Sequence, residues 1–148
     1  MSTERMNEAL GSIGVKVEPS APEEIDAFTL NVLPLLHEVR HALERLLASG
    51  EPTTIDLGSI PLAPGEFDRI DGALGTGEVK VMLDAMGPSQ VYETQFSGVW
   101  RITHFNAANE VVGRYVEVTR IPEILLAQEA DVRVGLDLLT RRLSGESD

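Results

Sequence analysis

Residues 98–118, GVWRITHFNAANEVVGRYVEV, contain two runs in which apolar and polar residues alternate. They predict strands over residues 98–105 and 111–119, the second of which ends one residue past the quoted stretch, and a short, asparagine-bounded connection at 106–109 separates them. Alternation with a period of two is typical of a strand with one buried face, and the short connection favours an antiparallel hairpin. We expect the buried side of this hairpin to carry four residues: Trp100, Ile102, Val116 and Val118.

The segments before and after the hairpin predict the rest of a small α+β fold. Further strand patterns lie at residues 53–57, 79–83 and 90–96. Helical patterns lie at residues 22–49, from Pro64, from Pro122, and over 131–143. Pro34 interrupts the first of these, where a proline either kinks a helix or begins a second one. This order of elements predicts an antiparallel sheet of about four to five strands with helices packed on one face.

Length, composition and charge limit the class of protein. A chain of 148 residues can bury a core of its own, and we expect a flexible N-terminal arm over 1–20 and a single domain over 21–148. No apolar run reaches the ~20 residues of a membrane helix and no secretory signal is visible, so a cytoplasmic location is expected. The absence of cysteine excludes disulfides and thiolate-bound metals within this chain. A net charge of −12 argues against nucleic acid and favours a basic protein partner.

The histidines are the first candidates for chemistry. His37 and His41 have the i, i+4 spacing with which two imidazoles can share a metal, and Glu44 projects from the same side. That side is opposite the apolar stripe of the helix, so a solvated pair is expected instead. His104 is either a general base or a satisfied structural histidine. The nucleophile or carboxylate that a base needs is sought among Ser97, Glu93, Glu110 and Glu117. We expect no catalytic residue, no cofactor and no metal, with a small hydrolase or metal-handling enzyme as the alternative.

Two further patterns bear on ligand and partner binding. The glycines of residues 72–77 follow a helix and lead into a strand, which is the reverse of a phosphate loop, and Lys80 lies inside that strand. A nucleotide site is therefore rejected. The last predicted helix is apolar on two sides, which means that it is either sandwiched within the fold or buried against another chain. A homodimer is one of the expected partners. The two sides of this helix carry Val132, Leu136, Leu139 and Leu143 on one and Val134 and Leu138 on the other.

An ordered series of short segments resembles a known family. The series is IDL (55–57), LGTGEV (74–79), ET (93–94) with GVWRITHFNA (98–107), and EV (117–118) with IPEIL (121–125). Together these segments resemble the HupH/HyaF family of hydrogenase expression and formation proteins, in a short single-domain form. The resemblance implies a cytoplasmic, non-catalytic accessory protein for maturation of uptake [NiFe]-hydrogenase. Its implied partner is the iron–sulfur small subunit or another hydrogenase maturation protein.

The expected working surface is a protein-binding face that combines the hairpin end with the segment after it. Its aromatic residues, Trp100 and Phe105, would supply the contact area typical of interface anchors. The alternative is that they belong to the core, and of the two Trp100 is the one more expected to be buried. Loops on a rigid sheet are where binding residues concentrate. The predicted binding residues are Trp100, His104, Phe105, Asn106, Asn109, Arg120 and Glu123.

Overall fold

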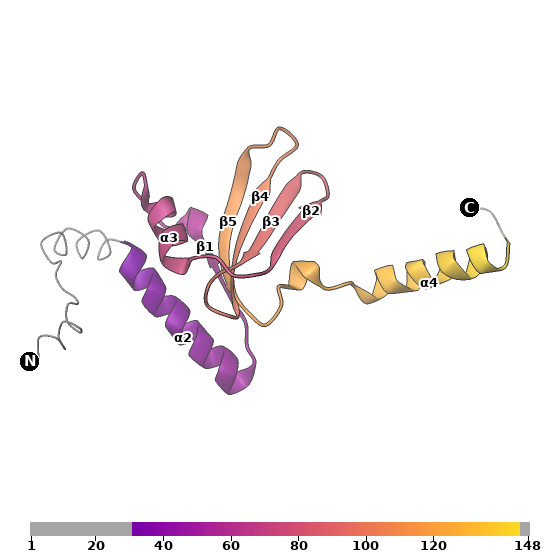
Figure 1. Cartoon of the computed structure of the whole chain (residues 1–148), viewed down its shortest axis with the longest axis horizontal. Coiled ribbons are helices and arrows are strands. Elements are labelled where there is room, and N and C mark those ends of the chain that lie inside the picture. Colours follow the sequence, from indigo (N-terminus) through magenta and orange to yellow (C-terminus); the bar gives the residue numbers. More distant parts are fainter. Residues whose placement is uncertain (1–30, 146–148) are drawn as a thin grey trace, which may run out of the picture.

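The computed structural model of the chain describes residues 31–145, which form a five-stranded antiparallel sheet with flanking helices (Figure 1). The strands are β1 (Thr53–Asp56), β2 (Lys80–Asp84), β3 (Pro88–Glu93), β4 (Val99–Phe105) and β5 (Val111–Val118). The helices are α2 (Leu33–Ser49), α3 (Glu66–Leu74) and α4 (Glu129–Leu143), with 3₁₀ turns η4 (Leu57–Ser59) and η5 (Glu123–Leu125). The strand order is β1-β5-β4-β3-β2, so β1 and β2 are the outer strands. The predicted α+β class is confirmed, and the predicted arm over 1–20 lies outside the described residues.

Helices α2 and α3 pack on one face of the sheet and form its larger apolar cluster (Figure 1). Pro34 is the second residue of α2, in the first turn, where a proline is tolerated because the first N–H groups of a helix have no intrahelical partner. Gly50 ends α2 with a left-handed φ of +79°, as expected of a glycine cap. The buried members of the cluster come from both layers: Val32, Leu35, Val39, Ala42, Ile55, Leu57, Ile70, Leu74, Val99, Val116 and Val118.

The other face of the sheet carries a smaller apolar cluster, which is covered by an irregular segment of the chain instead of a long helix. Its buried members are Val91, Trp100 and Ile102, with Val81, Leu83, Tyr115 and Leu125 packed around them. Leu125 belongs to residues 119–128, here named the crossing segment, which leaves β5 and returns over this face. The Trp100 Nε1–H donates to the Thr119 carbonyl over 3.0 Å and ties the start of the crossing segment to the sheet.

A β-bulge decides which residues of the hairpin share a face. Phe105 pairs with Val111, but the residue before it in β4, His104, pairs with Gly113. Val112 of β5 is therefore left unpaired. Beyond this bulge Val99 lies opposite Val118. The prediction that Trp100, Ile102, Val116 and Val118 share one buried side is therefore wrong. All four are buried, but the first two face the crossing segment and the last two face α2 and α3.

The last helix packs on neither face of the sheet. None of the α4 residues is buried, and the helix extends away from the sheet beyond the crossing segment (Figure 1). The prediction of a helix over 131–143 is confirmed, with its start at Glu129. Of its two expected settings, packing within the fold is not found among residues 31–145. Among residues 31–145 there is no helix with the length and apolar character to cross a membrane.

Candidate functional site

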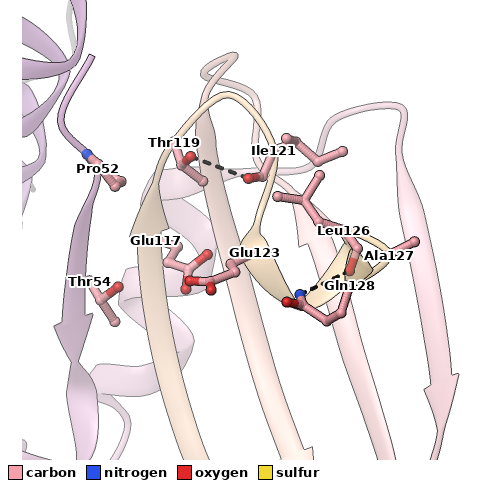
Figure 2. A pocket seen from close by; sticks show the side chains of 9 residues that line it. All are labelled: Pro52, Thr54, Glu117, Thr119, Ile121, Glu123, Leu126, Ala127 and Gln128. Carbon is pink, nitrogen blue, oxygen red and sulfur yellow. Dashed lines mark hydrogen bonds between the residues drawn. The ribbon is translucent and has the colours of Figure 1, made fainter. Parts of the chain in front are cut away.

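A hollow of about 400 Å³ opens between β5 and the crossing segment (Figure 2). We name it the acidic hollow, because two carboxylates, Glu117 and Glu123, point toward one another inside it. Glu117 lies on β5 and Glu123 opens η5. The remaining walls are Pro52, Thr54, Thr119, Ile121, Leu126, Ala127 and Gln128. Two carboxylates beside apolar walls favour a ligand that combines a positive charge with an apolar stem, as lysine and arginine side chains do.

Glu117 is the most perturbed carboxylate of this site. Burial raises its pKa above the ordinary 4.5, and the nearby Glu123 raises it further. A hydrogen bond with the Thr54 side chain and the proximity of His104 act in the opposite direction. The Oε1 atom is shielded from solvent and has no hydrogen-bond partner. An incoming donor would therefore satisfy an acceptor that the folded chain leaves unpaired.

His104 borders a second, smaller hollow of about 190 Å³ that also includes Glu117. Ile124 of the crossing segment also lines this hollow, so the crossing segment and His104 border the same space. The imidazole also meets the Tyr115 ring edge-on, with 5.7 Å between ring centroids. The structure thus brings the predicted residues His104 and Glu123 to the same face of the sheet. Trp100 lies beneath that face and is only 6% exposed, so it supports the surface more than it forms it.

Ser89 is the side chain that hydrogen-bonds to His104, a partner that was not predicted from the sequence. The two residues are directly opposite on β3 and β4, and Ser89 Oγ lies 2.7 Å from His104 Nδ1. A serine oxygen on an imidazole is the geometry of an activated nucleophile. Within the described part of the chain, however, no carboxylate forms a hydrogen bond or ion pair with His104. The contact therefore lacks the third group that orients a catalytic base, and it also serves as a cross-strand bond.

The hairpin end lies at the opposite end of β5 from the start of the crossing segment (Figure 1). Asn106 is half-buried, and its Oδ1 accepts hydrogen bonds from the amides of Ala108 and Glu110, each over 2.9 Å. Its Nδ2 donates to Glu110 Oε1 over 3.0 Å. Asn109 has a left-handed φ of +67° and donates its amide to the Asn106 carbonyl. Asn106 therefore holds the turn together, and its Oδ1 is engaged by two backbone amides of the turn.

The remaining predicted site residues lie elsewhere. Arg120 is exposed, and it lines a separate hollow of about 310 Å³ against the end of α2. Phe105 is half-buried at the end of β4. The seven predicted residues thus do not form one continuous surface. Of them, His104 and Glu123 lie around the hollows, with Trp100 beneath.

The other two histidines lie on the exposed side of α2. His37 and His41 are both exposed, and His41 Nδ1 lies 3.3 Å from Glu44 Oε1. Among residues 31–145 no group of three or more His, Cys, Asp or Glu gathers that could hold a metal ion.

Comparison with known proteins identifies related sequences and a related fold. Residues 29–145 match the model of the HupH hydrogenase expression protein, C-terminal conserved region. The chain is 28% identical over 107 residues to the hydrogenase expression/formation protein HupH of Rhizobium leguminosarum bv. viciae, covering 72% of this chain and 38% of that protein. It is 31% identical over 108 residues to HoxQ of Azotobacter vinelandii, covering 70% and 37%. The solved structure of HupH from Thiobacillus denitrificans ATCC 25259 matches with a TM-score of 0.75 at 42% identity, over 77% of this chain and 95% of that one. The chain spans less than two fifths of the length of these curated relatives.

Proposed function

We propose, on the premise that the chain belongs to the family of HupH hydrogenase expression proteins, that it is an accessory protein in hydrogenase maturation. The observation that carries the proposal is the family match, which includes every described helix and strand, from α2 to α4. The client we infer is the iron–sulfur small subunit of an uptake [NiFe]-hydrogenase, bound in the cytoplasm, or another maturation protein. In this role the chain binds its client and catalyses no reaction.

The acidic hollow is the surface on which we propose that the client is held. It contains two carboxylates, one of them with an unpaired shielded oxygen, in a chain with a net charge of −12. A basic side chain with an apolar stem would satisfy that oxygen and lie against Ile121 and Leu126. His104 and Ile124 extend the surface along the same face. Binding of this kind weakens as salt screens the charges.

A pull-down tests the client and the surface together. The full chain, tagged and expressed with the hydrogenase small subunit, should capture that subunit. The double substitution Glu117→Gln and Glu123→Gln should reduce the affinity about tenfold, because one charge-assisted hydrogen bond contributes roughly 1.5 kcal/mol or more. Glu38→Gln, which removes an exposed carboxylate on α2, is the matched control and should leave capture unchanged. Failure of the wild-type chain to capture the subunit overturns the client. Equal capture by both variants overturns the surface.

The Ser89–His104 contact supports one second candidate, a serine hydrolase. A fluorophosphonate probe labels a serine that an adjacent base activates. The proposed accessory role predicts no labelling of the wild-type chain. Labelling that disappears in Ser89→Ala, with unfolding behaviour unchanged, would favour the hydrolase.

A further inference from the structure

Helix α4 presents an apolar stripe that nothing in the described chain covers. Val132, Leu136, Leu139 and Leu143 are 56%, 63%, 57% and 80% exposed. Isolated helices of about 15 residues are marginal in water, and most helices owe their stability to packing of their apolar face. The fifteen residues of α4 therefore require a partner outside the described part of this chain.

The spacing of the stripe indicates what kind of partner covers it. The four residues follow one another at intervals of four, three and four, which is the pattern of a and d positions in a coiled coil. Such a narrow seam fits the seam of another helix, whereas a helix that packs on a sheet or in a globular core presents a broader apolar face. The partner surface is therefore a helix with a seam of similar length.

The charges at the two ends of α4 select the partner helix and its direction. The first turn carries Glu129 and Asp131, and the last turn carries Arg141 and Arg142. Two copies of α4 in antiparallel orientation place the acidic first turn of each beside the basic last turn of the other, with Asp131 and Arg141 as the charges to be matched, since Glu129 already pairs with Arg133 in its own helix. A parallel pair places like charges together. We propose that α4 pairs antiparallel with α4 of a second copy and makes the protein a two-fold symmetric dimer. A general basic client would match only the acidic end of the helix.

The length of the seam sets the expected strength of the dimer. A contact between two fifteen-residue helices is smaller than the roughly 1,200–2,000 Å² of stable interfaces. A reversible dimer with a Kd on the order of 10 µM is therefore expected. Sedimentation velocity of the full chain, from about 1 to 300 µM, should show the shift from monomer to dimer. A monomer across the whole range would overturn the proposal.

Matched substitutions on the two sides of α4 test the seam itself. Leu136→Glu places a charge in the seam, and Val134→Glu places the same charge on the other side at nearly the same exposure, 64% against 63%. Leu136→Glu should abolish the dimer over the accessible range, and Val134→Glu should leave its Kd within about twofold of the wild-type value. A dimer that survives Leu136→Glu, or that Val134→Glu disrupts equally, would show that the contact lies elsewhere.

Cysteine cross-linking tests the orientation, because the chain has no cysteine of its own. In the antiparallel pair, position 132 of one copy lies opposite position 143 of the other. An equimolar mixture of Val132→Cys and Leu143→Cys chains should therefore oxidise mainly to the mixed disulfide dimer. Cross-linking of each variant mainly with itself would indicate a parallel pair and overturn the proposed arrangement.

Discussion

Replacing Trp100 by phenylalanine tests how the crossing segment is held to the sheet. The change removes the hydrogen bond from the indole to the Thr119 carbonyl, whose net contribution is about 1 kcal/mol. Because Trp100 is only 6% exposed, the smaller ring also gives up buried apolar area, roughly 40 Å² or about 1 kcal/mol at 25 cal/mol per Å². The free energy of unfolding should therefore fall by about 2 kcal/mol.

Urea unfolding followed by far-UV circular dichroism measures this loss. With an m-value of about 1.5 kcal/mol/M, the midpoint should fall by roughly 1.3 M. Leu47→Ala, which truncates an 86% exposed leucine on α2, is the control and should change the free energy of unfolding by less than about 0.5 kcal/mol. If Trp100→Phe is as mild as this control, neither the indole bond nor the ring area holds the segment, and the reasoning fails.

Three further predictions concern single residues. Asn106→Ala should lower the free energy of unfolding, measured in urea, by about 1–2 kcal/mol, because the hydrogen bonds from two backbone amides of the turn are lost. Asn106→Asp keeps an oxygen that accepts both hydrogen bonds and should lose less than half as much. Equal losses in the two variants would contradict the assignment. Gly87→Ala should destabilise by ~2 kcal/mol or more in thermal unfolding, because φ is +116° and the new Cβ would clash with the Phe105 carbonyl oxygen. A loss under about 1 kcal/mol would mean that the turn relaxes freely. Glu117→Gln should stabilise the protein at pH 7, and the gain should shrink as the pH falls toward 4.5. A carboxyl whose pKa is raised in the folded state contributes stability at low pH, and this contribution is lost as the pH rises through that pKa. The neutral Gln side chain has no such dependence. A stability gain that does not change with pH would therefore refute the raised pKa of Glu117.

The strands of the hairpin were predictable because alternation is a local property, but their shared faces were not. Continued without a bulge, the pairing of Phe105 with Val111 would bring Trp100 opposite Val116 and so onto the same face, as predicted. The unpaired Val112 shifts the register by one residue, and Trp100 then lies opposite Glu117. A shift of one residue moves a whole set of side chains to the other face. Nothing in the alternation marks Val112 as the extra residue.

The candidate site was harder to predict because its contacts depend on chain reversals. Ser97 was among the predicted partners of His104, but the partner is Ser89, which only the register of β3 against β4 places there. The acidic hollow exists because the residues after Thr119 turn back over the sheet. The sequence signal at this point was Pro122, which predicted the start of a helix and gave no sign of the chain reversal. The apolar residues on two sides of α4, in contrast, predicted one of two settings: a helix sandwiched within the fold or a helix buried against another chain. The exposed position of α4 in the described structure fits the second setting.

The unequal covering of the two sheet faces has a consequence for motion. Eleven buried residues hold α2 and α3 to one face, whereas three buried residues and the crossing segment make up the other cluster. Local openings need the least free energy where the fewest apolar contacts must be broken. We therefore expect the crossing segment to open while the helix-covered face stays folded, so that its amides exchange with deuterium before those of α2. Each such opening would uncover Ile102 and the Trp100 ring without global unfolding.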